Sequence, residues 1–252
     1  MSETVLEGGD VNVVVRVGDT VRRPQGEWSP AVHALLLHFE AAGFDGAPRF
    51  LGIDEQGREM LSFVEGEAAL PPAPASDEVL VELGHFLRRA HEAVVDFEPP
   101  ADAAWFSGGE GPLICHRDLY PPNVIFRDGR PVALVDWDLA GPAEELDDIV
   151  SAACHWAPLR ADADKWGLPA DRQPERVRIL CDAYGLSAAD RARFVDKAIS
   201  IRRGGYELKK RLGRDERRPG WREMWDRGDG DRALANIRLL EELRPELEAA
   251  LA

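Results

Sequence analysis

HRDLYPPN at residues 116–123 and VDWD at residues 135–138 are the two segments on which the fold of this chain depends. Asp118 directly follows a short apolar strand, so its carboxylate is expected to project from a sheet edge into open space. Asn123 begins the next strand, and Asp136 ends the strand that pairs back to it. We therefore expect the hairpin to hold these two oxygen ligands side by side, facing the same space as Asp118.

Amide and carboxylate oxygens suit Mg²⁺, which also binds nucleotide phosphates. Asn123 and Asp136 are therefore the expected Mg²⁺ ligands, and Asp118 the base or orienting group for a hydroxyl nucleophile. Taken singly, each residue has a structural interpretation, because Asp118 suits a turn, Asn123 a strand start and Asp136 a hairpin end. Together, at the spacing H-x-D-x-x-x-x-N with a later aspartate, they favour phosphoryl transfer.

The same spacing is typical of the catalytic loop of the protein-kinase-like superfamily. Residues 115–149, CHRDLYPPNVIFRDGRPVALVDWDLAGPAEELDDI, most closely resemble the aminoglycoside phosphotransferase and choline kinase family. Val135-Asp136-Trp137 stands where protein kinases have Asp-Phe-Gly. The turn expected at Gly141-Pro142 and the later Asp148-Ile149 are similar to the family's Gly-Asp-Pro and Asp-Leu segments. The resemblance is specific over residues 113–150 and weaker elsewhere.

This resemblance implies a two-lobed, protein-kinase-like α+β fold with ATP bound between the lobes. It implies that Asp118 is the catalytic base and that Asn123 and Asp136 bind Mg²⁺. His116 is then expected to brace the loop rather than transfer a proton. Asp138 either assists metal or substrate binding or caps the turn.

The rest of the chain predicts a small N-terminal lobe over residues 1–65 and a larger, mainly helical C-terminal lobe over residues 66–252. The small lobe has β-branched, apolar stretches typical of an antiparallel sheet, expected at residues 11–17, 20–23, 49–53 and 59–64. One helix starts at Ser29-Pro30, in N-cap order, and stops at Gly43. The larger lobe opens with an amphipathic helix from about Ser76 to Val95, followed by a strand at 113–115 and a hairpin of residues 124–126 and 132–135.

The residues expected to bind the nucleotide phosphates depart from the kinase pattern. Kinases place a lysine on the third strand, paired with a glutamate on the following helix. Here that strand carries Arg22 and Arg23, of which Arg22 aligns better with the family and is favoured. Arginine binds phosphate through a planar fork of donors. The helix position expected to hold glutamate holds His33, and Glu27 or Glu40 are alternative sources of the carboxylate.

Two further segments are candidates by position. Phe63, Val64 and Glu65 correspond to the hinge that holds adenine through backbone groups in the resembled family. Residues 6–12, LEGGDVN, lie where a glycine-rich phosphate loop is expected, although an ordinary turn explains them equally well.

The composition of the chain favours some binding partners and one cellular compartment over others. The net charge of −15 disfavours nucleic acid and anionic membranes, and it suits a cationic small molecule. Cys115, Cys154 and Cys181 show neither a disulfide framework nor zinc-site spacing, which favours a reducing cytoplasm. The N-terminus lacks a signal-peptide pattern, and no stretch approaches 18 apolar residues, so we expect a cytoplasmic protein.

The expected function is transfer of the ATP γ-phosphoryl group to a hydroxyl of a small molecule, such as an aminoglycoside or an amino alcohol. Two acidic and two aromatic residues just past residues 113–150 have two interpretations: a pocket for an amine-bearing acceptor, or scattered surface acids. They are Trp156, Asp162, Asp164 and Trp166. One rival is a protein kinase, which Tyr120 disfavours because those enzymes have lysine there. The other is a catalytically weak or inactive kinase-like binding or immunity protein, which the missing lysine and glutamate favour.

Overall fold

The computed structural model describes residues 3–6, 14–69, 76–106, 108–163 and 170–252. The chain divides into two compact units, residues 1–70 with 86–148 and residues 71–85 with 149–252. The lobe boundary that we expect between residues 65 and 66 stays a prediction, and it differs from this division. Among the described residues, no helix has both the length and the apolarity needed to span a bilayer.

The first unit contains a five-stranded antiparallel sheet in the order β1-β2-β3-β5-β4. Its strands are β1 (Thr4–Val5), β2 (Val15–Val17), β3 (Thr20–Arg23), β4 (Phe50–Ile53) and β5 (Glu59–Ser62). The predicted hairpin between β2 and β3 is confirmed, and Gly18 in its turn has a positive φ of 60°. Strand pairing sets Arg23 opposite Glu59 and Arg22 opposite Met60. The two neighbouring arginines therefore point to opposite faces of the sheet.

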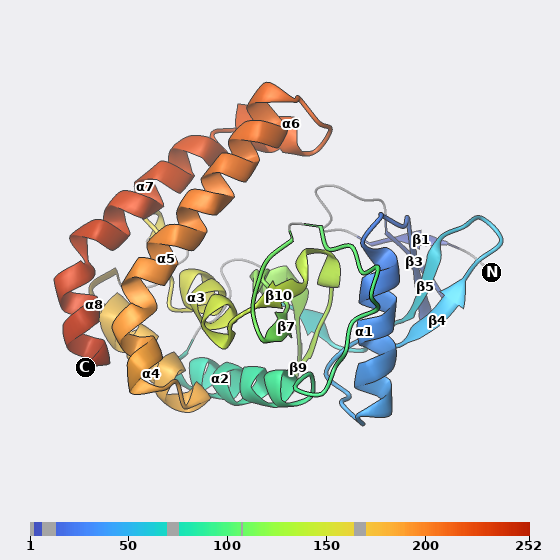
Figure 1. Ribbon diagram of the computed structural model, residues 1–252, viewed down its shortest axis with the longest axis horizontal. Coiled ribbons are helices and arrows are strands. Elements are labelled where there is room, and N and C mark those ends of the chain that lie inside the picture. Colours follow the sequence, from blue (N-terminus) through green and yellow to red (C-terminus); the bar gives the residue numbers. More distant parts are fainter. Residues whose placement is uncertain (1–2, 7–13, 70–75, 107, 164–169) are drawn as a thin grey trace. The chain divides into compact units, whose positions relative to one another are not determined.

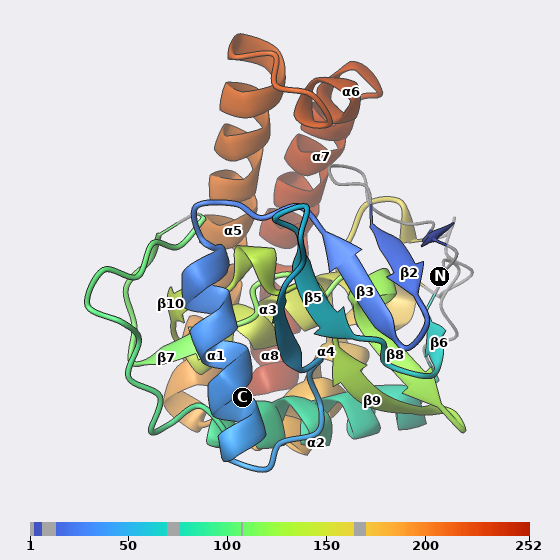
Figure 2. The same ribbon diagram turned by 90° about the vertical axis from the view of Figure 1, so that its right-hand side faces the viewer.

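Helix α1 (Ser29–Ala41) lies beside this sheet (Figure 2). Its buried residues include Val32, Leu35, Leu36 and Phe39, whose spacing places them on one face of the helix. The prediction that Ser29 is the N-cap is wrong, because Trp28 holds that position and the Ser29 hydroxyl accepts from the Gly26 N–H. The ring centroids of Phe39 and Trp137 lie 5.0 Å apart, so α1 packs on the turn that follows Asp136.

The other strands of the first unit form two small antiparallel sheets. The predicted hairpin is β8 (Val124–Arg127) with β9 (Arg130–Leu134), and β6 (Glu67–Ala68) pairs with β8. The expected strand β7 (Leu113–Cys115) pairs with β10 (Gly141–Ala143). The prediction of a turn at Gly141-Pro142 is therefore wrong. Proline is tolerated there because each strand of a two-stranded ribbon is an edge strand.

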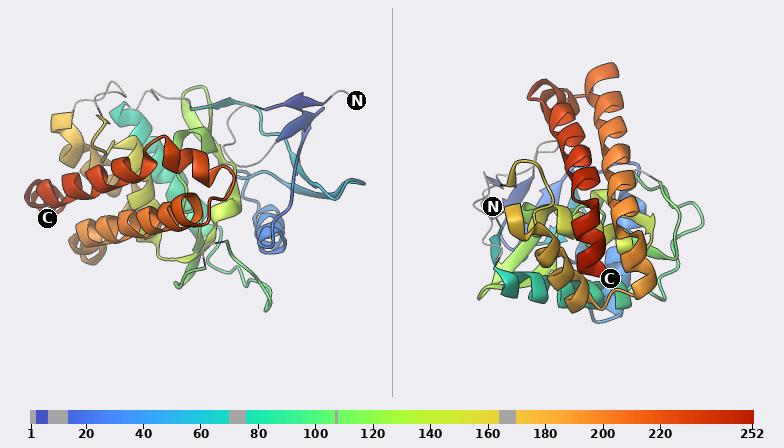
Figure 3. Two further views of the ribbon diagram at one scale, coloured as in Figure 1. Left: turned by 90° about the horizontal axis from the view of Figure 1, so that it is seen from above. Right: turned by 90° about the vertical axis from the view of Figure 1, so that its left-hand side faces the viewer.

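The second unit is helical. Helices α2 (Asp77–Glu92) and α3 (Glu145–Trp156) have residues in both units, and the remaining helices are α4 (Gln173–Tyr184), α5 (Ala188–Lys209), α6 (Trp221–Asp226), α7 (Asp229–Glu242) and α8 (Arg244–Leu251). Helices α5 and α7 run side by side, and α8 contacts α4 and α5 (Figures 1 and 3). The buried residues that these helices share include Leu180, Phe194 and Leu240.

Two local features of this unit agree with its sequence. The Ser76 hydroxyl accepts from the Val79 N–H at 3.4 Å, as expected of the residue before α2. Basic side chains between residues 202 and 222 make local ion pairs on the surface, including Lys210 with Glu207 and Arg217 with Asp226.

Candidate active site

The loop after β7 brings Asp118 and Asn123 together. A short 3-10 helix, Pro121–Asn123, turns the chain back toward Asp118. The Asn123 side-chain amide donates to the Asp118 backbone carbonyl at 3.0 Å and to its carboxylate Oδ2 at 2.9 Å. Because the Asn123 nitrogen is used in this way, its amide oxygen is the atom that can bind a cation.

Asp136 follows β9, next to Asn123 in the hairpin. The Val135 N–H donates to the Asn123 carbonyl at 2.9 Å, which fixes this neighbourhood. Asp136 has φ 62° and ψ 67°, a left-handed conformation that few residues other than glycine, asparagine and aspartate adopt. Such backbone strain gathers at functional sites. The Asp136 side chain is 50% exposed, so its carboxylate is accessible to a ligand.

His116 connects the two segments. Its Nε2 donates to the Val135 carbonyl at 3.0 Å, and its Nδ1 accepts from the Asp118 N–H at 3.3 Å. The ring is buried, and it meets the edge of Trp137 at a centroid distance of 4.6 Å. These contacts favour the bracing role that we expect for His116.

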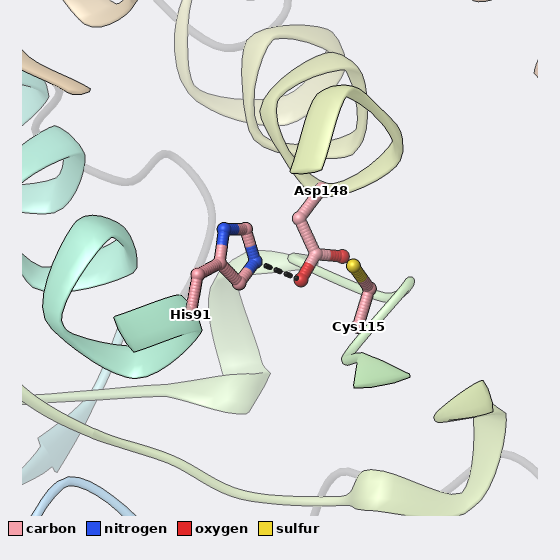
Figure 4. Close-up of side chains that lie close together, drawn as sticks. All are labelled: His91, Cys115 and Asp148. Atoms are coloured by element: carbon pink, nitrogen blue, oxygen red, sulfur yellow. Dashed lines mark hydrogen bonds and ion pairs between the residues drawn. The ribbon is translucent and has the colours of Figure 1, made fainter. Parts of the chain in front are cut away.

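A second brace holds the same loop from Asp148, which is fully buried at the start of α3 (Figure 4). Asp148 accepts from the His116 N–H at 2.9 Å, from the Arg117 N–H at 2.6 Å and from His91 at 3.0 Å. Burial by itself raises the pKa of the Asp148 carboxyl. The hydrogen bonds from His91 and from the Arg117 backbone outweigh burial and hold the pKa below its usual range.

His91, Cys115 and Asp148 form a buried group of potential metal ligands, with ligand atoms within 4.8 Å of one another (Figure 4). Their hydrogen bonds favour a brace instead. The Cys115 thiol donates to the Glu144 carbonyl at 3.3 Å, and its pKa is raised well above the usual range by burial and then by the charge of Asp148. A metal requires the thiolate, which this environment disfavours.

Replacing Asp148 by asparagine is expected to lower the free energy of unfolding by about 2 kcal/mol, because a neutral amide satisfies three buried donors poorly. The native pKa lies below the unfolded value of 3.8, so the carboxylate stabilises the fold above that pH. This stabilisation is lost as the pH falls through the native pKa. In urea titrations at a series of pH values, the difference in the free energy of unfolding between wild type and Asp148→Asn should therefore become smaller as the pH falls. A difference that does not change with pH would contradict the role of the Asp148 carboxylate as a brace. Asp96→Asn is the control, because Asp96 is exposed.

Arg23 is a buried cation that contacts three carboxylates. Its Nη1 donates to Asp136 at 2.7 Å and its Nη2 to Asp138 at 2.5 Å. Its Nε donates to Glu59, whose second oxygen lies 2.5 Å from His33 Nε2. A side chain of β3 therefore reaches the turn after β9, where two of the sequence-predicted site residues lie.

The charges of this cluster shift its pKa values in different directions. Burial lowers the pKa of Arg23, but the three carboxylates raise it above its usual range. Burial raises the pKa of Asp138, and the attraction of Arg23 does not offset that rise. Burial also raises the pKa of Glu59, but the hydrogen bond from His33 and the charge of Arg23 lower it below its usual range. The cluster therefore sets one buried guanidinium against three carboxylates, of which Asp136 is half-exposed and Glu59 is buried.

Arg22 lies elsewhere. Its Nε is 3.7 Å from the Asp54 carboxylate, on the opposite face of the sheet from Arg23. Because neighbouring residues of a strand point to opposite faces, only one of the two arginines can face Asp136. These contacts favour Arg23, whereas the family pattern favours Arg22.

The three hinge candidates have contacts of their own. The Arg16 guanidinium lies 3.5 Å from the centroid of the Phe63 ring and pairs with the Glu65 carboxylate at 3.1 Å. The Glu65 carbonyl accepts from Arg127 at 2.7 Å. Val64 lines a cavity of about 240 Å³ that Arg127 also lines. Phe63, Val64 and Glu65 stay candidates by position.

Two expectations from the sequence fall partly or wholly beyond the described residues. Of the glycine-rich segment at residues 6–12, only Leu6 is described, and Asp164 and Trp166 belong to residues 164–169, which are not described. Of the remaining acceptor-pocket candidates, Trp156 is buried and Asp162 makes an ion pair with Arg160.

Glu59 and His91 are not among the residues predicted from the sequence. Glu59 alternates with Leu61, which is also buried on β5, so strand alternation places the glutamate on the buried face. His91 lies one helical turn after the buried Leu87, on the apolar stripe of α2. Both signals were present, but pairing of β3 with β5 and of α2 with the catalytic loop is long-range and is not encoded in spacing.

Residues 102–196, which include Asp118, Asn123 and Asp136, match the phosphotransferase enzyme family. A trifolitoxin immunity protein from Rhizobium leguminosarum bv. trifolii is 42% identical over 210 residues, covering 79% of this chain and 80% of that protein. The chain belongs to the phosphotransferase enzyme family. This confirms the family that the catalytic-loop segment resembles.

Several solved structures have the same fold. A choline/ethanolamine kinase family protein from Mesorhizobium loti matches with a TM-score of 0.64 at 18% identity, covering 100% of this chain and 92% of that one. A microcompartment-associated aminopropanol kinase matches with a TM-score of 0.63 at 14% identity, covering 100% of this chain and 94% of that one. Aminoglycoside 2'-phosphotransferase-IIIa, solved with GDP, matches with a TM-score of 0.61 at 15% identity, covering 96% of this chain and 92% of that one. The predicted two-lobed, kinase-like α+β fold is confirmed.

Proposed function

We propose that this phosphotransferase-family protein transfers the γ-phosphoryl group of ATP to a hydroxyl of a small molecule. The observation that carries the proposal is the hydrogen-bonded assembly of Asp118, Asn123 and the Asp136 turn, with Arg23 bound to Asp136. Phosphoryl transfer needs a carboxylate for the acceptor, oxygen ligands for Mg²⁺ and a cation for the phosphates. This assembly offers all three.

Asp118 would orient the acceptor hydroxyl and take its proton as the new bond to phosphorus forms. Asn123 and Asp136 would hold Mg²⁺, which when bound supplies positive charge to the phosphate oxygens. The donor set fits this ion, because it combines an amide oxygen with a half-exposed carboxylate beside a second one, Asp138.

Arg23 would bind the nucleotide phosphates. At least three of its five N–H donors face carboxylates, which leaves at most two for phosphate oxygens in this arrangement. Adenine would lie against the hinge, Phe63 to Glu65.

The acceptor that we propose is cationic, such as an amino alcohol or an aminoglycoside. The net charge of −15 supports this choice, since an acidic protein attracts cationic ligands. The names of similar solved proteins include choline/ethanolamine kinase and aminopropanol kinase. Cys115, Cys154 and Cys181 are free and buried, which supports a reducing cytoplasm as the compartment.

A second candidate is a kinase-like binding protein that confers immunity without efficient turnover. The name of the 42% identical relative favours it. So does the engagement of Arg23 by Asp136 and Asp138.

A thermal-shift experiment with ATP or GTP and Mg²⁺, run beside an assay of nucleotide turnover, tests the proposal. Nucleotide at 100 times its Kd should add about 2.7 kcal/mol of stability. For a chain of this size, that corresponds to a rise in Tm on the order of 5–10 °C. EDTA should abolish the shift.

Labelled nucleotide and a panel of hydroxylated amines then identify the acceptor. A shift without turnover would favour the immunity-type binding protein. The absence of a shift with either nucleotide would overturn the proposed function.

A further inference from the structure

Three elements of the first unit meet at one buried contact. Arg23 on β3, Glu59 on β5 and His33 on α1 are 7%, 1% and 8% exposed. One Glu59 oxygen accepts from Arg23 Nε, and the other lies 2.5 Å from His33 Nε2. A single carboxylate therefore joins the phosphate-binding candidate to the helix.

Rigid neighbours fix each member of this trio. Arg23 and Glu59 lie opposite each other in the pairing of β3 with β5. The His33 ring stacks on Phe50 of β4, with centroids 3.9 Å apart and planes 15° apart. Because strand register and ring stacking both restrict motion, the Nε edge of Arg23 has one defined direction.

The direction of this edge matters because two other carboxylates compete for the same guanidinium. Asp136 and Asp138 bind the Nη atoms, on the side of the proposed metal ligands. Without Glu59, nothing described on β5 would hold Arg23 back from them. A guanidinium anchored at Nε presents its Nη edge to a phosphate in a fixed orientation, which saves the cost of ordering it on binding.

We propose that Glu59 and His33 are positioning residues that hold Arg23 for the nucleotide phosphates, with a strand glutamate replacing the helix glutamate of the kinase pattern. This inference rests on the proposed function. It explains why α1 carries a histidine at the position where we expect a glutamate: the carboxylate comes from β5, and the helix supplies its hydrogen-bond partner. It also excludes Glu40 as the source, because Glu40 pairs with Arg49 at 3.2 Å and is half-exposed.

Affinity for Mg·ATP relative to adenosine, measured by calorimetry on the full chain, tests this proposal. Adenosine lacks phosphates, so a damaged fold weakens both ligands, whereas a displaced Arg23 weakens ATP alone. Glu59→Gln should lower the affinity for Mg·ATP by roughly tenfold or more and leave that for adenosine within about twofold. GTP and guanosine replace these probes if the protein prefers guanine.

His33 offers an independent and milder pair of variants. His33→Ala removes the partner of Glu59 and should lower the ATP-to-adenosine ratio, whereas His33→Gln keeps a side-chain N–H donor and should restore most of it. Arg49→Gln, which breaks the exposed pair with Glu40, is the matched control and should leave both affinities unchanged.

Three results would overturn the inference. The affinity for Mg·ATP relative to adenosine could be unchanged in both Glu59→Gln and His33→Ala, although the wild type binds Mg·ATP. The proposed function would then hold, but Glu59 and His33 would not be positioning residues. An equal loss in Glu40→Gln would assign the carboxylate to the helix. A wild-type protein that binds neither Mg·ATP nor Mg·GTP would remove the proposed function and this inference together.

Discussion

Asp118→Asn is expected to lower kcat for acceptor phosphorylation by about 10³-fold, with the affinity for Mg·ATP changed by less than about twofold. The amide cannot take the acceptor proton, but it matches the carboxylate in shape. Its oxygen can still accept from the Asn123 side chain, so the loop should keep its conformation. Single-turnover phosphorylation of the acceptor, beside calorimetric titration with Mg·ATP, measures the two quantities separately.

Asp96→Asn is the control for this variant, because Asp96 is exposed and lies in the same unit. Full phosphorylation by Asp118→Asn would refute the assigned mechanism and return Asp118 to the role of a turn residue. Equal losses in kcat and in Mg·ATP affinity would instead indicate that the loop has collapsed.

The arrangement of the loop that carries Asp118 was predictable because its contacts are local. Asp118 and Asn123 are five residues apart, and one hairpin turn brings Asp136 back beside Asn123, so spacing and strand alternation suffice to place all three. The family resemblance implied that His116 braces the loop, and both hydrogen-bond partners of its ring, the Val135 carbonyl and the Asp118 N–H, belong to these two segments.

The side of the site that we propose for the phosphates was harder to predict because it depends on long-range pairing. Strand alternation shows that only one of Arg22 and Arg23 faces the site, but the choice between them depends on the register with β5. The carboxylate partner depends on that register too, because Glu59 is distant from α1 in sequence and adjacent to Arg23 only in the folded sheet.

Asp136→Asn is expected to reduce kcat/KM for Mg·ATP at least about 100-fold, because an amide is a weaker ligand for Mg²⁺ and the metal supplies several kcal/mol of charge stabilisation. Stability without metal should change by less than about 1 kcal/mol. Asparagine tolerates the positive φ of this position, Asp136 is half-exposed, and Arg23 keeps its contacts with Glu59 and Asp138. The substitution also removes a negative charge that contributes to the raised pKa of Asp138.

This contrast separates a metal ligand from a hairpin cap. A cap stabilises the fold, so its loss would lower stability and activity together. A ligand held in a strained backbone beside another carboxylate binds the ion at some expense of stability, so its loss should lower activity alone. Asp128→Asn is the matched control, because Asp128 is an exposed aspartate of the same hairpin with a φ of 52°. If both variants lowered stability equally and Asp136→Asn kept its dependence on Mg²⁺, the backbone conformation alone would explain the aspartate at residue 136.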